Sequence, residues 1–315
     1  MTTVVRTRRP VASHRARPAT GRSGRRRYSG LLMAAPALLL FGLFGLVPLV
    51  GVLVLSLSRW DGLGSIGWSG FANWTGVLTD GATWQALWLT VKVMVVSWLV
   101  QTPVALALGL FQAPRGRLRA LFAVLWFLPL LLSAVAIGLT WQALLDPSFG
   151  IGAAPGLHWL AKPLLGSPSL ALYTVIFVIA WQFVPFHALL YQAGVRQIPV
   201  SLYEAAAIDG AGPVTRLLRI TLPQLKYTFV TSSTLMLVGS LTYFDLIYVL
   251  SGGTGGPGTA TRVLPLAMYI TGFQTHDMGR ASALATILVV FGLALSLLTT
   301  RLSGFTRMDS QQEGM

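Results

Sequence analysis

Side chains that could carry out catalysis or hold a metal are few in this chain and widely separated. Its 315 residues include no cysteine, which excludes thiol chemistry and cysteine-based metal sites. The four histidines, His14, His158, His187 and His276, show no metal-ligand spacing. The sequence contains neither a Gly-x-Ser-x-Gly elbow nor an evident carboxylate pair, so it predicts no catalytic site, no metal and no cofactor in this chain.

The sequence also offers no site for ATP. A phosphate-binding loop needs Gly-Lys followed by Ser or Thr, because backbone amides and the lysine surround the phosphates. None of the three lysines, Lys92, Lys162 and Lys226, follows a glycine. Any ATP-driven activity therefore requires an ATPase on another chain.

The composition is that of a polytopic membrane protein. Apolar residues make up 54% of the chain and charged residues only 10%, whereas a soluble domain carries about 25% charged residues. A span needs about 20 apolar residues at roughly 1.5 Å rise each. The pattern predicts an all-α fold with about six transmembrane helices, at residues 31–57, 87–111, 120–145, 170–192, 227–250 and 281–300.

The distribution of basic residues predicts the orientation of these spans. Residues 1–30 carry nine arginines and no acidic residue, and further Arg and Lys residues cluster in alternate loops, so that one side holds eighteen of the 23 basic residues. Because cytoplasmic loops are enriched in Lys and Arg, both termini are expected in the cytoplasm. We expect a disordered tail at 1–30, a membrane domain at 31–302 with a cytoplasmic loop at 193–226, and a cytoplasmic tail at 303–315.

The net charge of +14 does not indicate nucleic-acid binding. Arginines beside a first span act as topology signals and can contact anionic lipid headgroups. The tail also lacks helical or aromatic patterning. Membrane lipid is therefore the expected partner of this charge.

The loop at 193–226 carries the most informative pattern. Glu204-Ala205-Ala206, three residues, Gly210, nine residues, and then Ile220-x-Leu222-Pro223 follow one another. Ser201 and Glu204 fit a capping box at the start of a short helix. A second short helix is expected at 214–220, after a break at Asp209 and Gly210.

This pattern resembles the cytoplasmic coupling loop of binding-protein-dependent ABC importers, especially permeases of the maltose and glycerol-phosphate type. Phe71-Ala-Asn73-Trp74, Leu128-Pro129 and Phe244-Asp245 resemble further segments of that subfamily, in the same order. The resemblance implies a type I importer permease fold in a bacterial inner membrane. It also implies that the loop docks on an ATPase through Glu204, Ala205, Ala206, Asp209, Gly210, Ile220, Leu222 and Pro223.

The same resemblance implies the partners and the solute. The chain is expected to pair with a second homologous permease and two ATPase subunits that bind ATP and Mg²⁺, and to receive a sugar or polyol from an extracytoplasmic binding protein. Candidate solute contacts are Gln182, Phe183, Phe186, Ser240 and Tyr243, since aromatic faces stack on sugar rings and polar groups bond their hydroxyls. The roles of Asp245, Lys92 and His187 stay open.

Two other functions remain as alternatives. An ion-coupled secondary transporter predicts buried ionisable pairs and inverted repeats, and the sequence shows no clear repeat. A membrane scaffold without transport activity leaves the complete loop pattern unexplained. Copurification with an ATPase distinguishes the importer from both alternatives.

Overall fold

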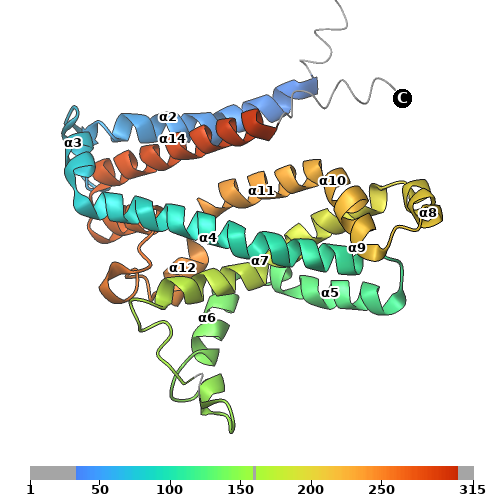
Figure 1. Ribbon diagram of the computed structural model, residues 1–315. Helices are drawn as coiled ribbons and strands as arrows, with labels where there is room; N and C mark the ends of the chain where they lie inside the picture. The colour runs from blue at the N-terminus through green and yellow to red at the C-terminus, as the bar shows by residue number, and fades with distance from the viewer. Residues whose placement is uncertain (1–32, 159–160, 304–315) are drawn as a thin grey trace, which may run out of the picture. The chain divides into compact units, whose positions relative to one another are not determined.

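A computed structural model describes residues 33–158 and 161–303 of the chain (Figure 1). The predicted tail at 1–30 lies outside these residues, and so does the predicted tail at 303–315 except for Ser303, which ends the last helix. The chain divides into two compact units, residues 1–50 and 51–315. The first unit contributes the start of an apolar helix, Met33–Leu55, which includes the π-helical turn η1 (Gly42–Leu46) and α2 (Val47–Leu55).

The described residues of the second unit are mainly helical and include a short antiparallel hairpin of β1 and β2, which pairs Ser58 with Trp68. Its elements are β1 (Ser58–Arg59), β2 (Gly67–Trp68), α3 (Ala72–Thr79), α4 (Gly81–Gln112), α5 (Arg117–Leu131), α6 (Ala134–Leu144), η2 (Ile151–Ala153), α7 (Ala171–Gln197), α8 (Val200–Ile208), α9 (Pro213–Arg216), η4 (Leu217–Thr221), α10 (Leu222–Gln224), α11 (Lys226–Ser240), α12 (Asp245–Leu250), η5 (Pro257–Thr259), α13 (Leu264–Tyr269), η6 (Ile270–Gln274) and α14 (Met278–Ser303).

The described helices fit a membrane protein by length and composition. Four of them are long and apolar enough to span a bilayer: Met33–Leu55, Gly81–Gln112, Ala171–Gln197 and Met278–Arg301. The bent pair of α5 and α6 makes a fifth if it is counted as one span. The all-α prediction is therefore confirmed, and four of the six predicted spans are single helices.

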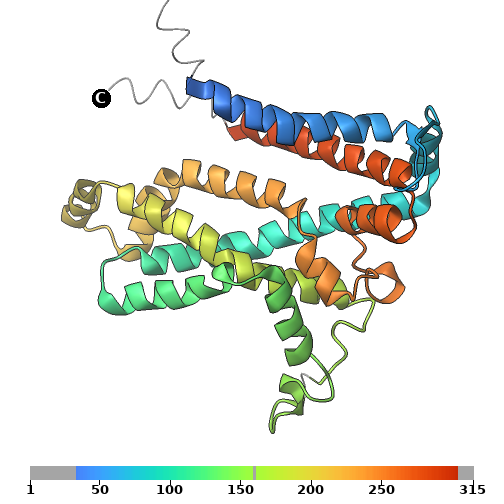
Figure 2. The same ribbon diagram turned by 180° about the vertical axis from the view of Figure 1, so that it is seen from behind.

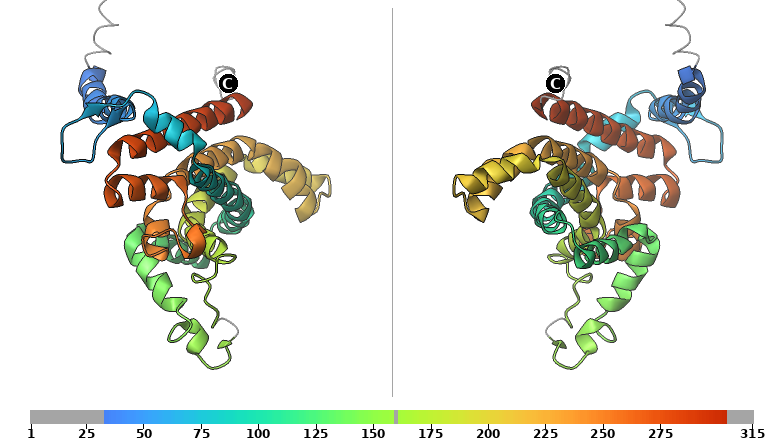
Figure 3. Two further views of the ribbon diagram at one scale, coloured as in Figure 1. Left: turned by 90° about the vertical axis from the view of Figure 1, so that its left-hand side faces the viewer. Right: turned by 90° about the vertical axis from the view of Figure 1, so that its right-hand side faces the viewer.

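The third predicted span, 120–145, is not a straight helix. Its two halves, α5 and α6, meet at an angle of 98°, and Figures 1 and 3 show α6 turning away from the line of α5. Pro129 lies in the last turn of α5, and Leu132 and Ser133 are extended. Proline cannot donate the helical hydrogen bond, so the chain changes direction here.

The fifth predicted span, 227–250, is also interrupted. α11 ends at Ser240 and α12 begins at Asp245. The hydroxyls of Ser240 and Thr242 donate to the carbonyls of Leu237 and Gly239. Such side-chain bonds compete with the backbone ladder, and the resulting break places residues 241–244 in an irregular segment.

The centre of this unit is the pair α4 and α7, which lie side by side in Figures 1 and 2. Gly109 allows the close approach, because a Cβ there would lie 2.6 Å from Cβ of Tyr191 and 2.8 Å from the Ala188 carbonyl oxygen. Small residues at such contacts are typical of membrane helix pairs. The main core cluster adds residues of α6, α12 and α13, including Ile137, Ile247 and Leu266.

Candidate functional site

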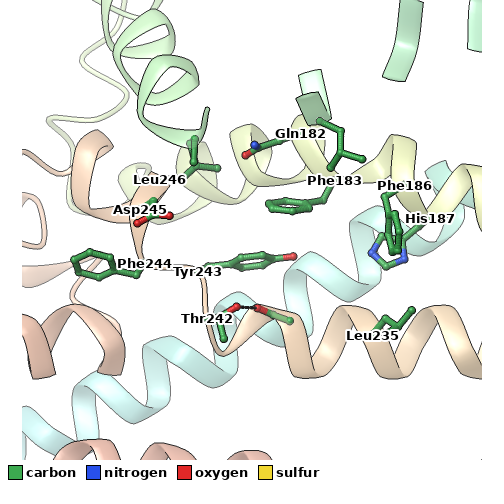
Figure 4. A pocket seen from close by; sticks show the side chains of 13 residues that line it. Gln182, Phe183, Phe186, His187, Leu235, Thr242, Tyr243, Phe244, Asp245 and Leu246 are labelled. Carbon is green, nitrogen blue, oxygen red and sulfur yellow. Dashed lines mark hydrogen bonds between the residues drawn. The ribbon is translucent and has the colours of Figure 1, made fainter. Parts of the chain in front are cut away.

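A cavity of about 450 Å³ lies where the junction of α5 and α6 meets α7, α11 and the broken segment before α12 (Figure 4). Both interruptions described above border it. Its lining consists of Leu130, Ala134, Gln182, Phe183, Phe186, His187, Leu235, Gly239, Thr242, Tyr243, Phe244, Asp245 and Leu246. The volume falls within the roughly 300–1,000 Å³ of small-molecule sites.

Aromatic faces form much of this cavity wall. The rings of Phe183 and Tyr243 lie 5.2 Å apart between centroids, at 30° to each other, and both are drawn in Figure 4. Phe186, one turn beyond Gln182 on α7, meets the His187 ring edge-on at 5.1 Å. The wall therefore offers apolar ring surfaces of the kind that stack on a flat ligand.

A few polar groups interrupt this apolar wall. Gln182 is only 4% exposed, and its Oε1 atom has no hydrogen-bond partner among the described residues. Asp245 lies at the start of α12, and its side chain is exposed. A buried carbonyl oxygen without a partner is costly, so the Gln182 Oε1 atom keeps an unused capacity to accept a hydrogen bond.

The structure brings together four of the five predicted solute contacts. Gln182, Phe183, Phe186 and Tyr243 line the cavity. Ser240 does not line it: the residue is 4% exposed and its hydroxyl donates to the Leu237 carbonyl oxygen at 2.7 Å.

Other lining residues were not among the five predicted solute contacts. Leu130 and Ala134 reach the cavity because the chain bends between α5 and α6, and Thr242 and Phe244 because α11 is interrupted. The Leu128-Pro129 pair was a signal for the first bend. No proline or glycine in 241–244 marks the second.

The 193–226 loop contains the two expected short helices, with different starting points. α8 begins at Val200, and its N-cap residue, Pro199, makes no side-chain capping bond. The predicted capping box is therefore wrong, because Ser201 lies inside the first turn rather than before it. The second helix begins at Pro213 rather than 214 and continues through η4 into α10.

A Schellman turn ends α8. The Ala211 amide donates to the Ala206 carbonyl oxygen at 2.8 Å, and the Gly210 amide donates to Ala207 at 3.1 Å. Gly210 has a φ of +72°, which favours glycine because a Cβ is strained there. The predicted break at Asp209 and Gly210 is confirmed.

Side-chain bonds then fold the two helices of the loop together. The Tyr203 hydroxyl lies 2.9 Å from the Thr221 hydroxyl oxygen, and Arg216 Nε donates to the Ala211 carbonyl oxygen at 2.8 Å. Tyr203 stands beside Glu204 in α8, and Thr221 ends η4. The loop is thus a compact unit rather than an open connection.

The outer surface of this loop carries exposed apolar side chains. Ile208 is 88% exposed, Val214 67% and Leu218 57%. Glu204 and Ala205 are exposed beside them, Ala206 and Ile220 are half-buried, and Leu222 and Pro223 open α10. Exposed apolar side chains of this kind mark a candidate protein-binding surface.

Arginine and glutamine side chains join this end of the molecule to the turn between α4 and α5. Gln192 Nε2 donates to the Gln112 carbonyl oxygen at 2.8 Å, and Arg196 Nε donates to Ala113 at 3.0 Å. The Arg115–Arg119 segment follows directly. Two segments that the sequence places on the same side of the membrane therefore meet in the structure.

The remaining charged residues do not gather at the cavity. Lys92 lies over the Tyr173 ring at 4.7 Å, and Arg280 pairs with Asp80 between the starts of α14 and α4. Within residues 33–158 and 161–303, no group of three or more His, Asp or Glu side chains could hold a metal ion.

A protein-family model matches about two thirds of the chain. The family model for the binding-protein-dependent transport system inner membrane component matches residues 101–307. The chain is 35% identical over 274 residues to the probable ABC transporter permease protein YurN of Bacillus subtilis, covering 85% of this chain and 93% of YurN.

Two relatives carry the names of sugar transport systems. The trehalose/maltose transport system permease MalF of Thermococcus litoralis is 32% identical, covering 88% of this chain and 94% of its own length. The lactose transport system permease LacF of Rhizobium radiobacter is 32% identical, covering 89% and 95%.

A solved structure shares the fold. A chain of a bacterial ABC transporter for import of the acidic polysaccharide alginate superimposes with a TM-score of 0.76 at 23% identity, over 89% of this chain and 96% of that one. Another structure of a bacterial alginate ABC transporter, in complex with an alginate pentasaccharide-bound periplasmic protein, also has a TM-score of 0.76.

Proposed function

Because this chain belongs to the family of binding-protein-dependent transport system inner membrane components, as a permease subunit of an ABC importer with the type I permease fold, we propose that it forms half of the pathway for a sugar or related polyol. Relatives named for trehalose, maltose and lactose transport support this solute class. No observation favours the ion-coupled transporter or the scaffold.

The cavity between α7 and α11 is the part of the pathway that contacts the solute. One observation carries this proposal: the unpaired, buried Gln182 amide oxygen beside the ring faces of Phe183 and Tyr243. A sugar presents hydroxyl donors at its edge and C–H groups on its faces. Gln182 accepts from the hydroxyls, while the rings pack against the C–H faces. Ser240 belongs to the same predicted set and supports the segment from behind the cavity.

The 193–226 loop docks on a separate ATPase, which binds ATP and Mg²⁺, and couples its movements to the membrane helices. Glu204 supplies a charged contact, while Ala205 and Ala206 allow a partner surface to approach closely. Asp209 and Gly210 form the turn that folds the loop, and Ile220, Leu222 and Pro223 join it to α11. The exposed Ile208, Val214 and Leu218 side chains support docking, because their burial against a partner removes apolar surface from water.

The complete importer contains a second, homologous permease, two ATPase subunits and an extracytoplasmic binding protein. Both termini and the 193–226 loop face the cytoplasm, as the arginine distribution favours. The periplasmic protein bound in one alginate transporter structure supports the binding-protein partner.

The test is the mass of the complex extracted in mild detergent from cells that express the chain with its neighbouring genes. We expect one copy of this chain, one homologous permease and two ATPase subunits. The extract is then tested for ATPase activity stimulated by the solute-loaded binding protein. A transport-competent monomer or homodimer that lacks the ATPase contradicts the proposal.

A further inference from the structure

The two helices that enter and leave the 193–226 loop, α7 and α11, share a buried polar contact. His187 is 3% exposed and Ser232 is fully buried. The Nδ1 atom of His187 lies 3.0 Å from the Ser232 hydroxyl oxygen. Figure 4 shows the His187 ring next to Phe186 and between α7 and α11.

The contact continues along the same face of α7 toward the loop. Tyr191, one turn after His187, is fully buried, and its hydroxyl lies near Ser232 without a hydrogen bond of standard geometry. Further on, Gly194 packs on Thr228: a Cβ at Gly194 would lie 2.6 Å from the Thr228 hydroxyl oxygen. The numbers rise along α7 as they fall along α11, so the helices run antiparallel here.

One end of this interface borders the cavity, and the other end leads into the loop. His187 lines the cavity and its ring contacts Phe186 at 5.1 Å between centroids. Beyond Gly194, the Arg196 side chain holds the last turn of α7 to the Ala113 carbonyl oxygen. α8 then begins at Val200. The contact between His187 and Ser232 therefore joins α7 to α11 at the cavity wall, on the stretch of α7 that leads to the loop.

We propose that His187 and Ser232 form a clasp that makes α7 and α11 move as one body, so that a change at the cavity wall reaches the 193–226 loop. This inference rests on the proposed importer function and assigns positioning roles to His187 and Ser232. Nothing in the ATPase-docking surface or the solute contacts includes Ser232, whose side chain is wholly enclosed between the helices.

The physical reason is the cost of parting the two helices. In an apolar interior, an imidazole and a hydroxyl that lose each other have no water to replace the bond. Sliding of α7 along α11 would break the bond while Gly194 moved against Thr228, whereas a rigid rotation of both helices breaks neither contact. The clasp thus favours joint motion over independent motion.

Three variants test the clasp, with a fourth as matched control. Ser232→Ala removes the hydroxyl, His187→Leu removes the ring nitrogen, and His187→Asn keeps a polar atom near the position of Nδ1. Ser233→Ala is the control, because Ser233 lies next to Ser232 but accepts a bond from Trp98 Nε1 of α4 at 2.9 Å. It therefore loses a link to α4 instead of the link to α7.

The measurement is the ratio of solute-stimulated to basal ATPase activity of the intact complex in lipid nanodiscs, at equal complex amounts. We expect Ser232→Ala and His187→Leu to lower this ratio about three- to tenfold, the equivalent of one hydrogen bond. His187→Asn recovers at least part of the ratio, and Ser233→Ala keeps it. A double variant that combines Ser232→Ala with His187→Leu falls no further than the worse of these two single variants, since both remove the same bond.

Several results would overturn the clasp. They are a ratio unchanged in Ser232→Ala, an equal fall in Ser233→Ala, or no recovery in His187→Asn relative to His187→Leu. Should His187→Leu fail to assemble, Ser232→Ala, which removes a single oxygen atom, decides the matter against Ser233→Ala. A wild-type complex without any stimulation contradicts the proposed importer function instead, so the two failures are distinct.

Discussion

The cavity and the 193–226 loop are built in opposite ways. Bonds in the loop join neighbours in the sequence, such as Ala211 with Ala206 and Arg216 with Ala211. The cavity gathers side chains from Leu130 to Leu246 across several helices. The loop can therefore keep its shape while its surface changes, whereas the cavity depends on how the helices pack.

The largest expected effect is on the loop surface. Glu204→Lys reverses an exposed charge on α8, and a misplaced like charge at a docking surface costs several kcal/mol. We expect solute-stimulated ATPase activity to fall about tenfold or more, with normal membrane insertion. Because α8 has no side-chain cap, helix stability should not change. Gln224→Lys, which adds a charge at another exposed position of the loop, is the control. Undiminished stimulation in Glu204→Lys would remove Glu204 from the docking surface.

A smaller effect is expected in the cavity. Phe183→Ala removes the ring that faces Tyr243, and aromatic contacts contribute about 0.5–1.5 kcal/mol beyond their buried area. The KM for uptake should rise about three- to tenfold. Basal ATPase activity should persist, because the loop is untouched.

Tyr243→Phe separates the hydroxyl from the ring in the same assay. We expect a rise in KM smaller than that of Phe183→Ala. Tyr227→Phe serves as the control. It also removes a tyrosine hydroxyl, but from α11 and at a position that does not line the cavity. If Phe183→Ala and Tyr243→Phe both transport normally, the cavity is not the solute pathway.

Two glycines of the loop test whether its shape is set locally. Gly210 has a φ of +72° and Gly212 a φ of −71°, and a Cβ at either position meets no atom within 4 Å. Only Gly210→Ala is therefore strained, by about 1–2 kcal/mol. Amide hydrogen exchange at residues 206–212 should accelerate about five- to thirtyfold in Gly210→Ala. Equal exchange in Gly210→Ala and Gly212→Ala would show that the turn does not depend on backbone strain.

The smallest effect is expected at a second locally built turn, between the first two predicted spans. The Gly64 and Leu63 amides donate to the Asp61 carboxylate at 2.7 and 2.9 Å and hold its pKa below the ordinary value. Because the folded pKa is lowered, this turn is stabilised above the ordinary Asp pKa and loses that contribution as pH falls through the folded value. The rate of hydrogen exchange at the Leu63 and Gly64 amides should therefore show an additional increase as the pH falls through the folded pKa of Asp61.

Asp61→Asn keeps an acceptor oxygen that does not titrate in this range. Its exchange should lack the additional increase, while ligand binding in the cavity stays the same as in the unmodified chain. An identical acid response in both proteins would contradict the role of Asp61 in the turn.

The loop was also the region that could be predicted best. Glycine at 210 permits the positive φ of the turn and proline at 213 fixes its own φ, so the break between two short helices follows from residue types. The capping box failed because α8 begins at Val200, with Pro199 as its N-cap, so that Ser201 lies inside the first turn. A helix start depends on backbone geometry as well as on a capping pattern. The predicted docking role of the loop residues remains a prediction.

The sequence by itself determined the membrane class, the all-α fold and the family resemblance, because these follow from composition, run length and a contiguous pattern. It also selected Gln182, Phe183, Phe186 and Tyr243. Only the tertiary structure decided that Ser240 does not line the cavity, that Leu130 and Thr242 do, and that His187 meets Ser232. Those outcomes depend on the 98° bend after α5 and on the close approach of α7 to α11, which are properties of packed helices and not of any single segment.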